Sequence, residues 1–388
     1  MKILHVIRGL ANSSGTTHIV GPLAEAQARL GEHVSVYFVQ KPGEAAVVPD
    51  PALVDSRCFA MTLRSRHYGW SRSFRAALRQ QIPSFDVVHI HAIWNYPTWA
   101  AMREALRAGV PYLVAPQGSL EDWALGRSRS LKRLYATLLE KPLFDRAACM
   151  QALTLAESEQ CRKFGIKSPA VILANGVDLH RIDGSGEPAD LRAELGLPQE
   201  ERLLLFLGRL FPKKGLDILA AALGRLIGTR DDISLLIAGH DAGTGYEQQV
   251  RCMLAASGAA RKTRFLGEIS GNRKFQVLRA VDVFVLTSYS EGLPIAVLEA
   301  MGAARPVIVT PGCNIPEVQQ HEAGWITEPD PEACAQTLQW AFKDEHELRR
   351  RGENARRLIE RQFTWDRIAA SSLEIYRRMV GINTTWLK

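Results

Sequence analysis

The sequence predicts an α/β protein made of two doubly wound, Rossmann-like domains. Its 388 residues suit two domains of roughly 150 residues or somewhat more. Short apolar runs alternate with helical patterns along most of the chain, which is typical of βαβ units and a parallel sheet. The pattern restarts near residue 174. Hydrophobic residues make up 46% and charged residues 23%, so collagen-like, coiled-coil and disordered classes are excluded.

The first domain is expected to span residues 1–173. Helical patterns cover Val20–Leu30 and Ser130–Leu143 between its apolar runs. The runs that predict its strands are Ile3–Ile7, Val34–Val39, Val87–Ile90, Tyr112–Ala115 and Met150–Thr154.

The second domain is expected to span residues 174–364. It opens with a polar, glycine-rich stretch, Asp183–Pro188, that extends neither a strand nor a helix. From Pro331 to Met379 the chain is helical in pattern almost throughout, with a break near Gln362–Asp366. The runs that predict its strands are Leu203–Leu207, Ser234–Ala238, Thr263–Leu266, Val283–Leu286, Val307–Val309 and Gly324–Ile326.

The six cysteines are far apart and form neither a C-x-x-C pair nor a His/Cys cluster at metal-ligand spacing. Reduced thiols are therefore expected, and with them a cytoplasmic protein. The first residues, Met1–Arg8, are apolar over too short a run for a signal peptide, and no run reaches the roughly 20 apolar residues that span a bilayer. Membrane contact is expected to be peripheral.

Positive charge is concentrated in the first half of the chain. Residues 1–175 hold 21 basic and 13 acidic side chains, whereas the remainder is nearly neutral. The stretch from Arg57 to Ile82 lacks acidic residues and places aromatic side chains between its arginines, which suits an anionic lipid surface or a lipid-linked diphosphate. No nucleic-acid recognition motif is present. The arginines concerned are Arg64, Arg66, Arg72, Arg75 and Arg79, with Arg127, Arg129, Lys132 and Arg133 as an extension.

The stretch from Leu286 to Gly302 predicts a strand, a tight loop and a helix with Pro294 in its first turn. Backbone N–H groups at such a helix start favour an anion such as phosphate. Glu291 stands beside these groups and Glu299 lies further inside the helix, where a carboxylate suits a vicinal diol. In the structural alternative, Glu291 complements the helix dipole and Glu299 is a surface residue.

A second loop, from Leu207 to Asp217, follows the first strand of the second domain. Arg209 and Lys214 therefore leave the strand end at which ligands of doubly wound sheets bind. A guanidinium and an ammonium near helix N-termini suit a diphosphate, although a charged turn in solvent is the structural alternative.

Together these motifs resemble the retaining glycosyltransferases of family 4, which have the GT-B fold with two Rossmann-like domains facing a central cleft. The glutamates Glu291 and Glu299 match the family's carboxylate pair, and Gly208-Arg209 with Lys214-Gly215 matches its diphosphate-binding loop. Asn175–Asp178 stands where the family joins its domains, and Asp86–His91 matches a strand end of its first domain.

The resemblance implies a role for each matching residue. Arg209 and Lys214 would bind the donor diphosphate and offset charge on the leaving group, with no metal and no cofactor. Glu299 would hold the ribose, and Glu291 with the Gly292 and Leu293 amides would hold the transferred sugar. The helix from residue 365 to 388 would pack back on the first domain. Donor-site residues implied in this way also include Gly15, Gly208, Gly267, Glu268 and Pro294.

Two loops depart from the family pattern. The loop after the first strand carries one matching glycine, Gly15, with Ser14 beside it. The loop after Tyr112–Ala115 carries Gln117 where a histidine that contacts the sugar is common; glutamine binds hydroxyls but is no base. His91 is then the remaining histidine of the expected cleft, as a catalytic candidate or as a structural residue.

The Gln117 loop is similar to that of a branch serving bacterial exopolysaccharide and surface-polysaccharide assembly. The expected reaction moves a hexose from a nucleotide diphosphate sugar to a glycan or lipid-linked acceptor, with GDP-mannose-type donors slightly preferred over UDP sugars. Two alternatives stay open: a nucleotide-sugar epimerase of similar fold, and a noncatalytic sugar-nucleotide-binding protein. A nicotinamide dehydrogenase is disfavoured because no G-x-G-x-x-G follows a predicted strand.

Overall fold

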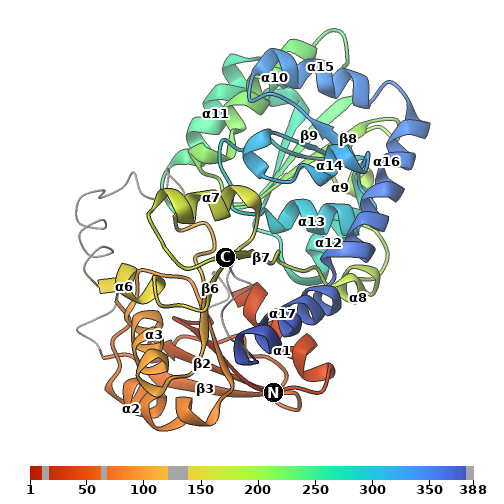
Figure 1. The fold of residues 1–388 in the computed structure, drawn as a ribbon. Helices are drawn as coiled ribbons and strands as arrows, with labels where there is room; N and C mark the ends of the chain where they lie inside the picture. Colours follow the sequence, from red (N-terminus) through yellow and green to blue (C-terminus); the bar gives the residue numbers. More distant parts are fainter. Residues whose placement is uncertain (11–16, 63–67, 121–138, 382–388) are drawn as a thin grey trace. The chain divides into compact units, whose positions relative to one another are not determined.

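The computed structural model describes residues 1–10, 17–62, 68–120 and 139–381, which form two compact units (Figure 1). The first unit comprises Met1–Gly176 and the chain from Trp365 onward, and the second comprises Val177–Thr364. All strand pairs in the described residues are parallel. The predicted fold class, two doubly wound α/β domains, is therefore confirmed.

In the described part of the first unit, the sheet has the strand order β3-β2-β1-β4-β5-β6-β7. The chain changes direction across the sheet between β1 and β4, and such a switch point is where ligands of doubly wound sheets bind. The strands are β1 Lys2–Ile7, β2 His33–Gln40, β3 Val54–Ala60, β4 Val87–His91, β5 Tyr112–Ala115, β6 Cys149–Ala152 and β7 Ala170–Ile172.

Helices cover both faces of this sheet. Ile3, Ile7 and Val87 face α1 and α17, whereas Leu4 and Val6 face α2 and α3. Helix α17 comes from the far end of the chain, yet it packs beside α1 (Figure 1). The helices are α1 Thr17–Arg29, α2 Arg72–Gln81, α3 Tyr96–Ala108, α6 Lys141–Phe144, α7 Leu155–Lys163 and α17 Trp365–Val380.

Two strands of the first sheet were not predicted. Most of β3 is exposed at the edge of the sheet, and its sequence alternates polar and apolar residues irregularly. Strand β7 is three residues long at the opposite edge. Neither needs the continuous apolar run that marks a strand buried on both faces. Most of the helix predicted at Ser130–Leu143 lies outside the described residues.

The described second sheet has the order β10-β9-β8-β11-β12-β13, with its switch point between β8 and β11. Its strands are β8 Arg202–Leu207, β9 Ile233–Ala238, β10 Thr263–Gly267, β11 Val283–Leu286, β12 Val307–Val309 and β13 Gly324–Ile326. Its helices are α8 Leu179–Asp183, α9 Leu191–Glu194, α10 Leu216–Leu226, α11 Tyr246–Ala256, α12 Gly271–Ala280, α13 Ile295–Gly302, α14 Glu317–Gln320, α15 Pro331–Ala341 and α16 Glu345–Leu358.

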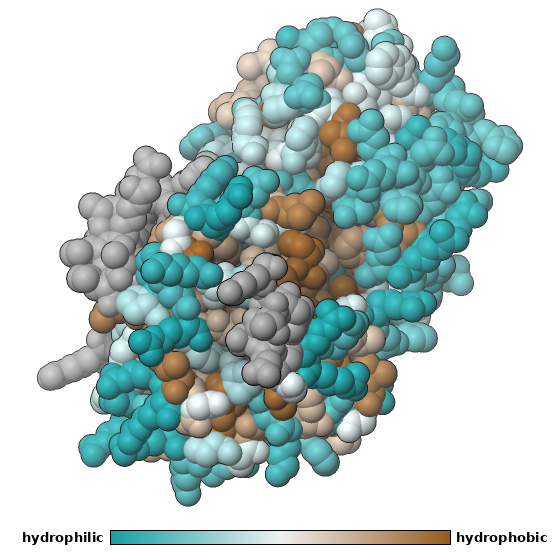
Figure 2. All heavy atoms as spheres, viewed as in Figure 1, coloured by the Kyte–Doolittle hydropathy of each residue, from teal (hydrophilic) through white to brown (hydrophobic). Residues whose placement is uncertain are grey.

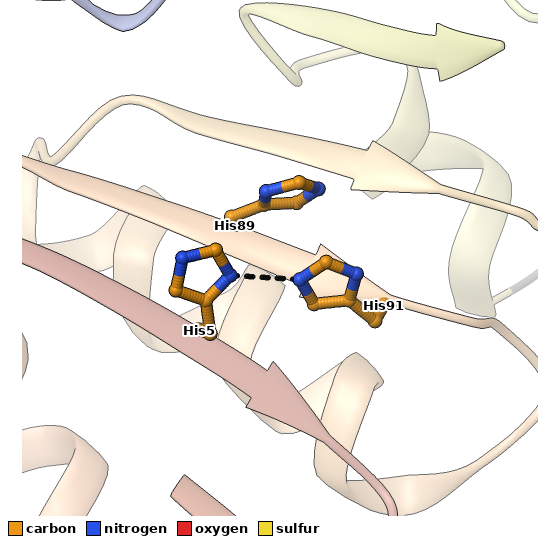
Figure 3. A group of neighbouring side chains, drawn as sticks. All are labelled: His5, His89 and His91. Carbon is orange, nitrogen blue, oxygen red and sulfur yellow. Dashed lines mark hydrogen bonds between the residues drawn. The ribbon is translucent and has the colours of Figure 1, made fainter. Parts of the chain in front are cut away.

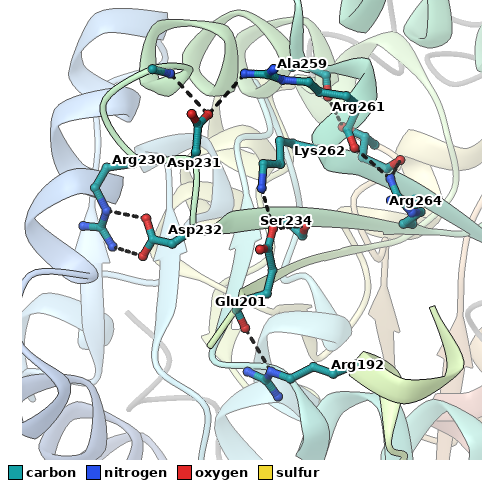
Figure 4. A network of polar contacts seen from close by, with 12 residues as sticks. Arg192, Glu201, Arg230, Asp231, Asp232, Ser234, Ala259, Arg261, Lys262 and Arg264 are labelled. Carbon is teal, nitrogen blue, oxygen red and sulfur yellow. Dashed lines mark hydrogen bonds and ion pairs between the residues drawn. The ribbon is translucent and has the colours of Figure 1, made fainter. Parts of the chain in front are cut away.

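A polar network holds the amino ends of the strands in the second sheet (Figure 4). Glu201, just before β8, is buried and accepts hydrogen bonds from Ser234 at 2.5 Å and from Lys262 at 2.9 Å. Arg230 and Asp232 form two parallel bonds of 2.8 Å just before β9. These charged side chains stabilise the end of the sheet that is opposite the predicted donor site.

The surface of α16 carries a ladder of ion pairs. Glu347 contacts Arg350 at 2.8 Å and Arg351 at 2.7 Å, and Glu345 contacts Arg349 at 2.6 Å. The side of the molecule where α16 lies is accordingly hydrophilic (Figure 2). The near-neutral charge of the second unit thus includes many charges that are locally paired.

All six cysteines are unpaired. None of the helices in the described ranges has both the length and the apolar character required to cross a bilayer.

Gly215 is required where the loops after β8 and β11 touch. Its φ is 68°, and a Cβ at this position would lie 1.9 Å from the Thr287 carbonyl oxygen. Gly228 has a similar φ of 83°, but a Cβ there would meet nothing within 4 Å. Comparing substitutions at the two glycines therefore separates the cost of a positive φ from the cost of a steric clash.

We predict that Gly215→Ala lowers the free energy of unfolding of the second unit by about 3 kcal/mol or more. Gly228→Ala is the matched control, with an expected loss of about 1 kcal/mol from its positive φ alone. Urea unfolding of both variants measures the difference. Equal losses would show that the contact between the two loops has no role.

Candidate active site

Two loops meet at the switch point of the second sheet. The 3₁₀ turn Pro212–Lys214 follows β8, and the loop from Thr287 follows β11. The Thr287 hydroxyl donates to the Gly215 carbonyl at 2.7 Å, and the Tyr289 N–H donates to the Lys213 carbonyl at 2.8 Å. The two motifs singled out in the sequence therefore form one continuous surface at the carboxyl ends of the strands.

Glu291 lies at the centre of this surface and is 7% exposed. One carboxylate oxygen, Oε1, contacts Lys214 Nζ at 2.7 Å and accepts the Ser288 hydroxyl at 2.7 Å. The Glu291 N–H donates to the Gly312 carbonyl at 2.8 Å, and the Glu291 carbonyl accepts the Asn314 side chain. Glu291 thus connects the loops after β8, β11 and β12, and its charge is balanced by Lys214.

Backbone amides next to Glu291 are available to an anion. The N–H groups of Gly292, Leu293 and Ile295 donate to no backbone acceptor within the described chain. Pro294 was predicted inside the first helical turn, but α13 begins one residue later, at Ile295. The extended ψ of 108° at Pro294 keeps this residue outside the helix, although its carbonyl still accepts the Val297 N–H. The amides still lie at the start of the helix, where the helix dipole favours negative charge.

Glu299 has a different partner from Glu291. Its Oε1 contacts Lys274 Nζ of α12 at 2.5 Å, and its side chain is 14% exposed. Lys274 also lies 4.6 Å from the centre of the Phe275 ring, so its position is fixed from two sides. The two predicted carboxylates are thus neutralised separately and do not share a proton.

Arg209 is exposed just beyond β8, and its guanidinium lies 5.3 Å from the centre of the Phe211 ring. It forms no ion pair with a carboxylate of the described residues. The preceding residue, Gly208, has open space around its Cα, with only Lys214 and Phe206 side-chain atoms near 4.0 Å from a built Cβ. An anion can therefore approach the backbone here and meet an unbalanced positive charge.

Gly267 and Glu268, predicted beside the nucleobase, lie at the end of β10. Gly267 has a φ of 69°, and its carbonyl accepts the Gly239 N–H at 2.7 Å. The exposed Glu268 lies 3.4 Å from His240, which follows β9. These two residues stay candidates at the carboxyl ends of the strands.

In the first unit, His91 ends β4 and Gln117 follows the neighbouring strand β5, and their side chains touch each other. Gln117 Nε2 lies 3.3 Å from His91 Nδ1, and His91 Nε2 lies 2.8 Å from His5 Nδ1. His91 is 1% exposed, and burial together with the charges of His89 and His5 holds its pKa well below its usual value. His91 is therefore a neutral, fully engaged side chain, and a catalytic role for it remains a prediction.

Several predicted residues fall outside the described residues, namely Ser14, Gly15, Arg64, Arg66, Arg127, Arg129, Lys132 and Arg133. Of the remaining arginines, Arg72, Arg75 and Arg79 are exposed on α2. Arg75 lies 3.6 Å from the buried Glu104, so part of its charge is balanced.

Sequence reasoning missed three side chains of the donor-side surface: Ser288, Asn314 and Lys274. Ser288 directly follows the β11 loop residue Thr287, and its place after a predicted strand was a usable signal. Asn314 and Lys274 lie 23 and 25 positions from their glutamate partners, with no motif to connect them. Only the fold brings these last two to the site.

A buried carboxyl, Glu140, supports the loop after β4. Glu140 accepts the N–H of Trp94 at 3.1 Å, and Trp94 has an unusual φ of 67° for a residue with a side chain. Burial raises the pKa of Glu140 to about 8, with the Trp94 N–H as a smaller opposing effect. The carboxyl is therefore mostly protonated at neutral pH.

We predict that this carboxyl makes the first unit less stable as the pH rises from about 5 to about 8. An unfolded chain releases the proton near pH 4.5 and the folded chain near pH 8, so the folded state binds the extra proton in this window. The free energy of unfolding should fall by up to about 1.4 kcal/mol per pH unit. In Glu140→Gln, which keeps the acceptor for Trp94, this slope should disappear; urea unfolding across the pH range measures it. A slope that persists in the variant would assign it to other groups.

Known proteins match both units. The model of the family "Glycosyl transferases group 1" matches residues 189–358, and that of the "Glycosyl transferase 4-like domain" matches residues 14–176. D-inositol 3-phosphate glycosyltransferase of Saccharomonospora viridis is 32% identical over 310 residues, covering 76% of this chain and 71% of the relative.

Solved structures share the fold. Sucrose-phosphate synthase from Thermosynechococcus elongatus superposes with a TM-score of 0.76 at 20% identity, covering 98% of this chain and 99% of that one. Anabaena HepE, solved with UDP and glucose, superposes with a TM-score of 0.73 at 17% identity, covering 97% and 99%. The two family models and the shared fold therefore identify a GT-B glycosyltransferase. This chain belongs to glycosyltransferase family 4 and is a transferase enzyme.

Proposed function

We propose that the protein is a retaining, metal-independent glycosyltransferase of bacterial cell-surface polysaccharide synthesis. It would move a hexose from a nucleoside-diphosphate sugar to a glycan or lipid-linked acceptor. The observation that supports this most is the Lys214–Glu291 pair at the β8–β11 switch point, beside unpaired amides at the start of α13. Membership of a transferase family disfavours the epimerase and the noncatalytic binding protein.

In the proposed donor site, each of these side chains and amides has one role. Lys214 and the exposed Arg209 would bind the diphosphate and offset charge on the leaving group, and Glu291 with the Gly292 and Leu293 amides would hold the transferred sugar. Glu299, held by Lys274, has a second oxygen for the ribose diol. Uridine donors are supported by the UDP complex of HepE, and GDP-mannose-type donors by the resemblance of the Gln117 loop.

Retention is proposed to follow a front-side route, in which a leaving phosphate oxygen helps deprotonate the acceptor hydroxyl. Glu291 is a poor candidate nucleophile, because it is buried and its Oε1 is occupied by Lys214 and Ser288. Cationic side chains would then supply the electrostatic stabilisation that other sites obtain from a metal ion.

Peripheral contact with anionic lipid is a further part of the proposal. The exposed arginines of α2, Arg72, Arg75 and Arg79, follow Trp70, whose side chain is 40% exposed. This combination of cations and an aromatic ring suits a membrane interface.

Lys214→Met should weaken binding of nucleoside diphosphates by about tenfold or more, because a charged contact to phosphate is lost. Lys262→Met is the matched control: Lys262 pairs with the buried Glu201 at 2.9 Å, but at the opposite end of the same sheet. Both variants leave a buried glutamate without its cation and should lose stability, whereas only Lys214→Met should lose affinity.

Thermal shift with UDP and GDP, followed by calorimetry, measures the two effects, because a ligand that binds only the folded state raises the melting temperature. Equal nucleotide affinity in the wild type and in Lys214→Met would exclude this site as the donor site.

The transfer reaction should proceed at the same rate in EDTA as in buffer, and the product should keep the anomeric configuration of the donor. Metal independence follows from a leaving group stabilised by Arg209 and Lys214, and retention follows from the front-side route, in which the acceptor attacks the face that the leaving group departs from. Nucleoside diphosphate release gives the rate, and proton NMR of the product gives the anomer. Loss of activity in EDTA that Mg²⁺ restores, or an inverted anomer, would contradict the mechanism.

A further inference from the structure

A chain of buried hydrogen bonds crosses the first unit and ends at Gln117. Two of its members, His5 and His91, and the neighbouring His89 extend from the same face of the adjacent strands β1 and β4, and their rings lie against one another (Figure 3). His5 Nε2 contacts Gln27 Oε1 of α1 at 2.7 Å, and His5 Nδ1 contacts His91 Nε2 at 2.8 Å. All three histidines are at most 1% exposed.

The opposite end of the chain is fixed by helix α17. Gln27 Nε2 donates to Ser372 Oγ at 2.7 Å and to Tyr376 Oη at 3.2 Å. The Ser372 hydroxyl donates its own hydrogen to the Ala369 carbonyl at 2.7 Å, and a carbonyl can only accept. Ser372 must therefore accept from Gln27, so the Gln27 amide presents its nitrogen to α17 and its oxygen to His5.

The donor-to-acceptor direction set at Gln27 also fixes which nitrogen carries the proton in His5 and His91. Because Gln27 Oε1 accepts, His5 carries its proton on Nε2 and its Nδ1 is an acceptor. His91 must then donate from Nε2, which leaves its Nδ1 to accept from Gln117 Nε2 at 3.3 Å. Burial lowers the pKa of His5 to about 4, so both rings are neutral and each carries one proton.

The last group in the chain is the carbonyl oxygen of Gln117. It is buried and has no hydrogen-bond partner, whereas the Gln117 nitrogen is engaged by His91. Gln117 also has a φ of 52°, and the next N–H, that of Gly118, donates to the buried Glu157 at 2.6 Å. Hydrogen bonds thus hold both the side chain and the adjacent backbone of Gln117. A buried acceptor without a partner costs free energy unless a ligand donates a hydrogen bond to it.

We propose that His5, His91 and Gln27 are positioning residues that hold the Gln117 amide with its nitrogen on His91 and its oxygen unpaired, as an acceptor for a hydroxyl of the sugar substrate. The inference rests on the proposed transferase function for its substrate class. It explains how a glutamine can take one defined orientation at a position where neither amide rotamer is favoured intrinsically.

Metal binding is the competing use of the same histidines, whose nitrogens lie close enough together to hold an ion. Both nitrogens of His5 and of His91 are already used in hydrogen bonds, and His89 Nδ1 contacts Tyr376 Oη at 2.6 Å. A divalent ion would have to break these bonds, in a fully buried place with no carboxylate among the three ligands. The hydrogen-bond chain, in contrast, requires no change in the positions or the partners of these rings.

NMR spectra of ¹⁵N-histidine-labelled enzyme test the direction of the chain without any substrate. In the wild type at neutral pH, His5 and His91 should both be neutral with the proton on Nε2. Gln27→Met, which removes the amide but keeps the volume, should abolish this fixed tautomer at both rings. Gln40→Met is the matched control: Gln40 is a buried glutamine of β2 in the same unit that contacts none of the histidines.

Two spectral outcomes would overturn the proposal: a proton on Nδ1 of His91 in the wild type, or tautomers that do not change in Gln27→Met. Stoichiometric Zn²⁺ should leave the spectra as they are. Stable binding of Zn²⁺ with loss of the His5–His91 hydrogen bond would show that the histidines form a metal site instead.

Kinetics test the consequence for the substrate. Hydrolysis of UDP-glucose and GDP-mannose, in which water takes the sugar and nucleoside diphosphate is released, should fall about tenfold in both Gln27→Met and Gln117→Met, and remain at the wild-type level in Gln40→Met. UDP and GDP should bind all of these proteins alike, because their proposed site is in the other unit. Fixed tautomers with unaltered turnover in Gln27→Met would contradict the positioning role. A wild type that releases no nucleoside diphosphate would contradict the proposed function, while the spectra would still decide whether the chain sets Gln117.

Discussion

The Glu291 carboxylate is the group on which the arrangement of the second unit's ligand-facing loops depends. A charge that is 7% exposed is tolerated only with a cation and further hydrogen bonds around it. Lys214 and the Ser288 hydroxyl meet this requirement, and in doing so they fix the loop after β8 against the loop after β11. The two loops also approach closely at Gly215 and the Thr287 carbonyl, where only a residue without a Cβ leaves room.

Charge at the same strand ends is divided in a way that suits a dianionic ligand. The Lys214–Glu291 and Lys274–Glu299 pairs are each neutral, whereas Arg209 remains unbalanced in the described residues. In the proposed donor site, a diphosphate would meet a helix start and the positive charge of Arg209. Because the glutamates keep their own cations, the site need not bury a lone carboxylate before the ligand arrives.

The sequence was sufficient for the sheets and for the motif residues at their carboxyl ends, because buried parallel strands are continuous apolar runs and ligands bind where they end. It was insufficient where an edge strand such as β3 is half exposed, and where a partner is set by tertiary structure alone, as for Lys274. The tautomers of His5 and His91 could not be predicted from the sequence for the same reason. They depend on the orientation of the Gln27 amide, which is fixed by Ser372, 345 positions from Gln27.

The discontinuity of the first unit has a consequence for biosynthesis. Its sheet and α1 are made first, but Gln27 has no partner on α17 until Ser372 and Tyr376 have been translated. The second unit, Val177–Thr364, is continuous and can be completed on the ribosome while the first still lacks its last helix. The domain that begins the chain is therefore the last to finish folding, and a nascent or truncated chain without α17 exposes the apolar face that Leu373 and Met379 cover.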